Sequence, residues 1–147
     1  MTLLPADLRF ALNLNGHASC IHRARETAFD PWPVVKFFNP VGVATWIATE
    51  IDGDGDTLFG LADLGFGCPE LGCFSLAEIA AVRLPFGLAI ERDAYFDPLA
   101  PLSDWTGAAR RLGSIRLAEK ALLRRKIDRL LPDPPPDADR HGGGADS

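Results

Sequence analysis

The stretch from Glu50 to Phe59 reads EIDGDGDTLF and is the most chemically suggestive run in the chain. Counted from Asp52, carboxylates occupy calcium-ligand positions 1, 3, 5 and 12 of an EF-hand loop, the last of them Asp63. Position 6 of such a loop is a glycine, whereas here it is Thr57. EF-hand loops also lie between helices, but the flanking segments ATWIATEI and TLFGLADL are typical of strands. The pattern therefore predicts the tip of a β-hairpin, and weak cation binding at its surface is compatible with that interpretation.

A second set of residues has side chains that bind zinc, which favours tetrahedral groups of cysteine and histidine. The set comprises His17, Cys20, His22, Cys68 and Cys73. Its spacing matches no compact zinc motif, and Cys73 lies in a strand-like run where cysteine often acts as a small buried hydrophobe. We therefore predict no metal site and no cofactor.

Several carboxylates could support acid–base chemistry, because two neighbouring carboxylates shift each other's pKa. They are Glu50, Asp63, Glu70, Glu91 and Asp93. No nucleophile elbow and no phosphate-binding loop accompanies them, so the sequence names no reaction. A catalytic carboxylate pair and a solvated sheet face both remain open interpretations.

Charge is distributed unevenly along the chain. Residues 1–101 carry a net charge of −7, residues 102–131 carry +5, and residues 132–147 carry −3. The acidic body argues against broad electrostatic capture of nucleic acid. A local contact with nucleic acid or an acidic partner through 110–129 remains open, as does a solvated helix face. The residues concerned are Arg110, Arg111, Arg124, Arg125 and Lys126.

The apolar periodicity places these residues on a small set of elements. It predicts a helix over 3–15, irregular chain over 16–31, strands over 33–38, 44–51, 57–66 and 72–76, and a last strand or extended segment over 88–96. The first four strands follow one another too closely for intervening helices, which indicates an antiparallel meander. Ser75 and Glu78 fit a capping box, and Ser103 is predicted to cap the next helix.

Residues 114–131 carry the strongest helix signal, with apolar positions on one side and basic residues mostly elsewhere. The sequence thus predicts an α+β domain over 1–113, with an antiparallel meander and helices packed on one face. A basic amphipathic helix over 114–131 and a disordered proline-, glycine- and aspartate-rich tail over 132–147 follow it. The apolar side of that helix is compatible with a monomer or a homodimer.

The sequence also sets expectations about location. No window of 18 uninterrupted apolar residues is present, and the N-terminus lacks a basic start before an apolar run. Three cysteines form an odd and sparse set. We therefore expect a cytoplasmic protein that does not span a membrane.

The order of short motifs from about residue 3 to 112 resembles a small bacterial family, domain of unknown function 2958. The motifs are Val35-Lys36-Phe37-Phe38, Thr45-Trp46 with Thr49-Glu50, Phe59-Gly60-Leu61 with Asp63-Leu64-Gly65, Pro69-Glu70-Leu71-Gly72, Ser75-Leu76-Ala77-Glu78, and Gly87-Leu88 with Glu91-Arg92-Asp93. The sequence departs from the family pattern at Cys73, where an aromatic residue is expected.

The resemblance implies no activity, but it draws attention to a candidate polar surface within the motif-bearing segments. Its residues are Thr49, Glu50, Asp63, Glu70, Glu91, Arg92 and Asp93. Members of the family resemble cargo of conjugative elements, plasmids and phages, which implies a role in the transfer, maintenance or protection of mobile DNA. Our first interpretation is a non-enzymatic module that binds a host or element-encoded protein. A carboxylate-based, metal-dependent or metal-free hydrolase and a DNA-contacting protein are the alternatives.

Overall fold

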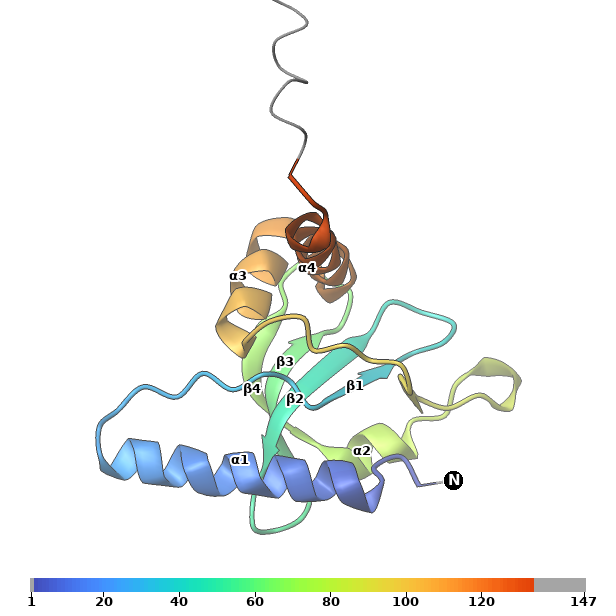
Figure 1. Cartoon of the computed structure of the whole chain (residues 1–147). Coiled ribbons are helices and arrows are strands. Elements are labelled where there is room, and N and C mark those ends of the chain that lie inside the picture. The colour runs from blue at the N-terminus through green and yellow to red at the C-terminus, as the bar shows by residue number, and fades with distance from the viewer. Residues whose placement is uncertain (1, 134–147) are drawn as a thin grey trace, which may run out of the picture.

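A computed structural model describes residues 2–133 and contains one five-stranded antiparallel sheet with four α-helices (Figure 1). The strands are β1 (Val35–Phe38), β2 (Thr45–Ile51), β3 (Thr57–Asp63), β4 (Glu70–Ser75) and β5 (Glu91–Arg92). The helices are α1 (Ala6–Ala24), α2 (Leu76–Ala81), α3 (Leu102–Leu112) and α4 (Ile115–Leu130), with a short 3-10 helix η1 (Pro85–Gly87) after α2. The predicted α+β class is confirmed.

The sheet order is β4-β3-β2-β1-β5. Strands β1 to β4 therefore form the predicted meander, and β5 returns to pair with the free side of β1. The β2–β3 turn is the Asp-Gly segment, where the Asp52 N–H donates to the Thr57 carbonyl over 2.8 Å. The predicted hairpin is confirmed. Within the stretch predicted as a last strand or extended segment, 88–96, strand β5 takes up only two residues.

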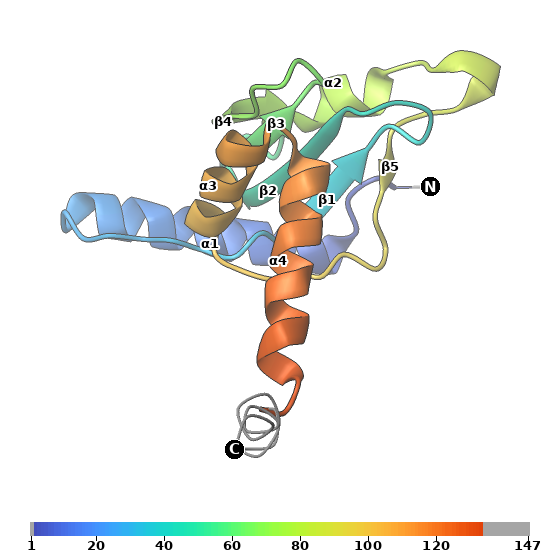
Figure 2. The ribbon, with the colours of Figure 1, turned by 90° about the horizontal axis from the view of Figure 1, so that it is seen from above.

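Helices cover both faces of the sheet, which differs from the predicted arrangement on one face. Strand β2 is buried along most of its length, and Trp46 and Ala48 pack into one core while Ile47 packs into the other. We call these the first and second faces. Helices α1 and α2 pack on the first face, and α3 and α4 on the second (Figures 1 and 2). A central strand with both sides covered carries apolar residues in succession, and Trp46, Ile47 and Ala48 of β2 follow one another in this way.

Helix α1 runs to Ala24, well past the end predicted at residue 15. The glycine that suggested an end, Gly16, serves instead for close packing. A Cβ at that position would lie 2.7 Å from the Ile51 carbonyl oxygen of β2. The adjacent Asn15 side chain donates to the Thr49 carbonyl over 2.8 Å. Helix α1 is thus fastened to the end of β2, and its last turns extend beyond the strand.

The sequence predicted the N-terminal cap of α2 correctly but not that of α3. The Ser75 hydroxyl accepts from the Glu78 N–H over 3.2 Å, which confirms this capping bond. Asp56 of the hairpin reinforces it by accepting from the Ala77 N–H over 2.7 Å. Helix α3 begins at Leu102, so Ser103 lies inside it, and the acceptor for the Ser103 N–H and hydroxyl is the distant Asp30 carboxylate. The prediction of Ser103 as the cap was therefore wrong.

Helix α4 begins after Ser114, whose hydroxyl accepts from the Leu117 N–H, and it matches the helix predicted over 114–131. Its side chains Ile115, Ala118 and Leu122 are buried in the core on the second face of the sheet. An ion pair of 2.9 Å joins Glu119 to Lys36 of β1. Helix α4 therefore shares its core with the sheet and α3. Within residues 2–133, no helix is long and apolar enough to cross a membrane.

Candidate functional site

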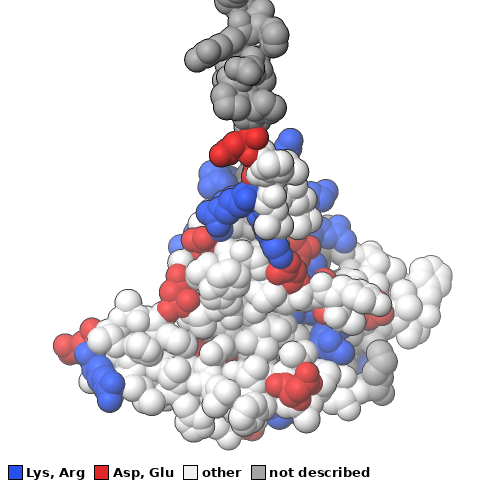
Figure 3. Space-filling model, in the orientation of Figure 1, with Lys and Arg blue, Asp and Glu red and all other residues white. Residues whose placement is uncertain are grey.

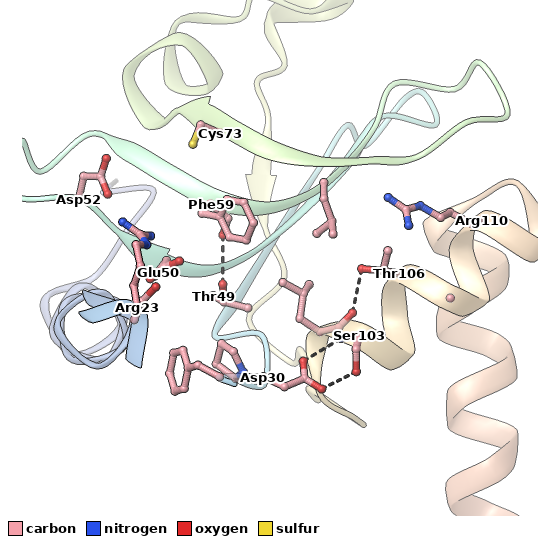
Figure 4. Close-up of a pocket in the computed structure, with 16 residues that line it drawn as sticks. Arg23, Asp30, Thr49, Glu50, Asp52, Phe59, Cys73, Ser103, Thr106 and Arg110 are labelled. Carbon is pink, nitrogen blue, oxygen red and sulfur yellow. Dashed lines mark hydrogen bonds between the residues drawn. The ribbon is translucent and has the colours of Figure 1, made fainter. Parts of the chain in front are cut away.

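A cavity of about 740 Å³ lies on the second face of the sheet, between the last turns of α1, the segment leading to β1, and α3 (Figure 4). Phe59 and Leu71 contribute apolar surface from β3 and β4. Arg23 and Glu50 lie together on one side, and Arg110 of α3 reaches in from the other. The cavity thus combines an apolar wall with charged groups at separate ends.

A β-bulge in β2 determines which side chains reach the cavity. The β2–β3 register shifts between Ala48 and Glu50, so that one residue is added to β2. Such an insertion places two consecutive side chains on the same side of a strand. Thr49 and Glu50 accordingly both line the cavity, and Ile51 returns to the core of the first face. The Thr49 hydroxyl donates to the Phe59 carbonyl over 3.3 Å and forms part of the wall.

The cavity changes the pKa of the Glu50 carboxyl. Burial raises the pKa of its carboxyl above the ordinary value for glutamate, and the nearby charge of Asp52 adds to the rise. The Ser19 hydroxyl and the Arg23 guanidinium oppose it. A half-buried carboxyl with this balance is suited to receive a cationic or hydrogen-bonding group from a ligand.

Replacing Glu50 with glutamine is expected to stabilise the fold near neutral pH. Because the folded pKa is raised, the folded chain binds more protons than the unfolded chain in the interval between the two pKa values. Stability contributed by the protonated group is therefore lost as pH rises through that interval. We expect Glu50→Gln to melt above the wild type at neutral pH, and the two to converge below about pH 4.

Thermal unfolding at the two pH values measures this, with exposed Glu26→Gln as the control that should shift neither melt. A Glu50→Gln variant less stable than the wild type at neutral pH would show that Ser19 and Arg23 more than compensate for burial.

The far wall of the cavity is built by a link between the α1–β1 segment and α3. The Asp30 carboxylate accepts from the Ser103 N–H over 3.0 Å and from the Ser103 hydroxyl. The Thr106 hydroxyl donates to the Leu102 carbonyl over 2.9 Å. The bonds from Ser103 to Asp30 hold the start of α3 against the segment that follows α1, and Arg110 lies about two turns further along the same helix.

The structure distributes the predicted polar surface over several places. Thr49 and Glu50 line the cavity, but Glu70 on β4 and Glu91 on β5 lie at opposite edges of the sheet. Asp93 lies 3.6 Å from Lys36, between β5 and α4. Asp63 and Arg92 are described separately below.

Asp63 and Arg92 lie within the fold, where Asp63 is hydrogen-bonded and the buried Nε of Arg92 has no hydrogen-bond partner among the described residues. Asp63 is 3% exposed and accepts backbone N–H groups from Gly65 and Ile115, each over 2.9 Å. Arg92 pairs with Phe37 in the β1–β5 ladder, on the first face of the sheet. The structure therefore does not bring the seven residues together on one face.

The predicted basic contact residues are also divided. Arg110 points into the cavity, whereas Arg111 and Arg124 are exposed on α3 and α4. Arg125 pairs with Asp104 over 2.8 Å, and Lys126 pairs with Asp97. Figure 3 shows lysine and arginine side chains gathered over the region of α4, above a body with few charges on the visible face.

The aspartates of the β2–β3 hairpin tip accept hydrogen bonds from nearby residues of the fold. Asp54 accepts from the Thr57 N–H and hydroxyl, which holds the pKa of its carboxyl below the usual range, and Asp56 accepts from Ser75 and Ala77. These hydrogen bonds fold the hairpin tip. Over the described part of the chain, no cluster of three or more His, Cys, Asp or Glu residues has the geometry to hold a metal ion.

Sequence reasoning missed Ser19, Arg23 and Asp30, because it placed all three in irregular chain. A signal was present for the first two: neither proline nor a second glycine interrupts the helix-compatible stretch from His17 to Arg25. No local pattern identifies Asp30 as the partner of Ser103, because 73 residues separate them.

Comparison with known proteins identifies the family. The sequence model for "Protein of unknown function (DUF2958)" matches residues 3–116. No curated protein and no solved structure matches the chain. The matched range begins where the resemblance noted from the motifs begins, and it extends through α3 into the first turn of α4. The chain therefore belongs to the DUF2958 family.

Proposed function

We propose that this protein is a non-enzymatic interaction module that binds a segment of a partner protein in the cavity between α1, the sheet and α3. The observation that carries the proposal is the cavity itself. It offers about 740 Å³ beside an apolar wall, with Glu50 and Arg23 on one side and Arg110 on the other. Sites of this size, mostly apolar with a few placed charges, are typical of specific binding.

Several cavity polar groups are already engaged in building the walls, which favours binding over chemistry. The hydroxyls of Thr49 and Thr106 donate to backbone carbonyls, and Asp30 accepts from the first turn of α3. Glu50 and Arg110 then provide the charge for recognising a ligand. Charges at separate ends of a groove fix the direction of a bound segment more than they raise its affinity.

The setting we propose is that of an accessory protein of mobile genetic elements, with a role in DNA transfer, maintenance or anti-defence. Support comes from the resemblance of DUF2958 members to cargo of such elements, which is an argument by association. The partner would be a host protein or a protein encoded by the same element.

Gly107 allows a direct test, because it lines the cavity from an exposed position on α3. A Cβ there meets no atom within 4 Å, so a side chain can be added without disturbing the helix. We expect Gly107→Trp to fill the cavity and abolish partner capture. Gly107→Ala should keep capture and stabilise α3 by about 0.5–1 kcal/mol, the usual gain over glycine inside a helix.

The measurement is affinity capture from a bacterial lysate with full-length wild-type, Gly107→Ala and Gly107→Trp baits, with and without nuclease, read by mass spectrometry. A nuclease-resistant protein retained by the first two baits and lost by the third supports the proposal. A protein captured equally by all three baits would place binding elsewhere and reject the cavity as the site.

Two alternatives have specific observations behind them. Glu50 and Asp52 line the same cavity, and the raised pKa of Glu50 suits a general acid in a hydrolase. Arg116, Lys120 and Arg124 recur every four residues along α4 and are exposed, which suits contact with DNA phosphates. Hydrolysis lost on Glu50→Gln would favour the first alternative, and capture that vanishes with nuclease would favour the second.

A further inference from the structure

We propose that the partner segment binds as an added strand along the outer edge of β4, with alternate side chains entering the cavity. This inference rests on the proposed function and specifies how the segment is held. Strand β4 is the terminal strand of the sheet, and within residues 2–133 no strand pairs with the outer side of its backbone. Addition of an extended peptide to such an edge supplies main-chain hydrogen bonds, and pockets beside it supply specificity.

The ladder determines which β4 residues present their backbone outward. In an antiparallel ladder, hydrogen-bonded and non-hydrogen-bonded pairs alternate. The Asp52 N–H donates to the Thr57 carbonyl, so the pair two residues further along, Glu50 and Phe59, is hydrogen-bonded as well. The backbone of Phe59 therefore faces β2. Its partner on the other side, Cys73, is left with its N–H and carbonyl pointing away from β3.

Counting from the β1–β2 ladder shows that the backbone of a second β4 residue, Leu71, also points outward. The Asn39 N–H donates to the Ala44 carbonyl, and alternation along β1–β2 from this pair makes Ile47 face β3. Leu61 is the partner of Ile47 and faces back to β2. Leu71, opposite Leu61, therefore also presents its N–H and carbonyl to the outside.

The same two residues line the cavity. Leu71 and Cys73 lie on the second face of the sheet, and both side chains contribute to the wall. A second hollow of about 520 Å³ adjoins it and is lined by Gly67 to Leu71 and by Arg110. Because both hollows share Leu71 and Arg110, space continues along the edge of β4. A segment paired with Leu71 and Cys73 would place every second side chain over this space.

Charge and shape specify the kind of segment. Phe59 and Leu71 favour an apolar side chain at the centre of the cavity. At one end Glu50 and Asp52 outnumber Arg23, which favours a basic residue there. At the other end Arg110 lines the cavity, with Glu70 only in the adjoining hollow, which favours an acidic residue or a terminal carboxylate. The occupant is therefore an extended partner segment with a basic residue, an apolar residue and an acidic residue in alternating positions.

The opposite edge of the sheet lacks these features. Strand β5 has only two residues. Edge strands in proteins are commonly shortened or blocked, which prevents unwanted pairing. Strand β4 has six residues, and its edge is exposed at Leu71 and Cys73.

Cys73→Pro tests the added strand. Proline removes the outward N–H and leaves the ladder to β3 intact, because Cys73 does not bond to β3, and the preceding Gly72 has no Cβ to clash with the ring. Cys73→Val keeps the N–H and is the matched control. The probe is the tightest peptide that the wild-type chain selects from a displayed library of random linear peptides. We expect Cys73→Pro to weaken its binding roughly tenfold or more, and by clearly more than Cys73→Val, which reports the effect of changing the side chain alone.

A second measurement on the wild-type chain keeps the test valid if the proline variant melts early. Nuclear Overhauser contacts between the backbone protons of Leu71 or Cys73 and those of the bound peptide are expected. A peptide whose binding is lost with Gly107→Trp but kept with Cys73→Pro, without these contacts, would overturn strand addition and retain the cavity. Failure to select any peptide would reject both, and self-association through β4 would show that the edge is covered by a second copy instead.

Discussion

Replacing Asp63 with alanine is expected to lower the free energy of unfolding by about 3–5 kcal/mol. Asp63 is 3% exposed, and its carboxylate accepts two backbone N–H groups, from Gly65 after β3 and from Ile115 at the start of α4. A hydrogen bond to a charged group contributes about 1.5–3 kcal/mol, and the alanine variant leaves a buried N–H without its partner. Asp63 thus joins the sheet to the helix pair that bounds the cavity.

Chemical denaturation of the Asp63→Ala variant measures this effect, with Asp97→Ala as the control. Asp97 accepts a backbone N–H from Leu99 and pairs with Lys126, but its side chain is 47% exposed. We expect the control to lose no more than about 1 kcal/mol, as is usual for exposed pairs. Similar losses in both variants would mean that Asp63 does not hold α4 to the sheet.

Replacing Gly60 with alanine is expected to destabilise the fold by about 3 kcal/mol or more. A Cβ at this position would lie 1.9 Å from the Ile47 carbonyl oxygen and 2.9 Å from the Ala48 Cα. Both atoms belong to the backbone of β2, so the strands would have to separate, and overpacking that moves backbone lies at the upper end of measured costs. The contact lies beside the bulge, so the positions of Thr49 and Glu50 should change as well.

Gly72→Ala is the matched control, because Gly72 is the ladder partner of Gly60 and its Cβ would meet no atom within 4 Å. We expect Gly72→Ala to retain wild-type stability or gain slightly. The measurements are the denaturation midpoint of both variants and the near-ultraviolet circular dichroism of the tryptophans. Equal stability of the two variants would contradict the close strand approach at Gly60.

Much of the sheet was predictable from sequence because its signals are local. Asp-Gly pairs between β-branched and aromatic runs specify the hairpin, and the short spacing of the strands specifies antiparallel order. Ser75 and Ser114 cap their helices through neighbouring N–H groups, so their positions can also be inferred from adjacent residues. The order of short motifs was sufficient to identify the family.

The elements that were not predicted depend on contacts between distant residues. Gly16 resembled a helix end, and only the approach of β2 explains why α1 continues through it. Asp30 caps α3 from 73 residues away. The motifs grouped Glu70 with Glu91 and Asp93 on one candidate polar surface, but they could not place Glu70 at the opposite edge of the sheet. The cavity therefore emerges only when α1, the bulge and α3 are assembled.

Both proposals place the partner in the cavity, and a few features of the fold give the cavity its shape. The bulge beside Gly60 turns Thr49 and Glu50 toward it, and the Asp63 carboxylate secures the helix pair that carries Arg110. The free edge of β4 runs along its rim with Leu71 and Cys73. A partner segment would therefore contact residues from several separate parts of the chain, which accounts for the absence of a single local motif for the site.

The most direct test is amide hydrogen exchange across the full chain, with and without the partner retained by the wild-type and Gly107→Ala baits. If the partner binds in the cavity and along β4, amide exchange should slow in β4 and in α3 from Leu102 to Arg110. The exposed face of α4 should change little. Protection confined to α4, with β4 and α3 unchanged, would contradict the cavity as the binding site.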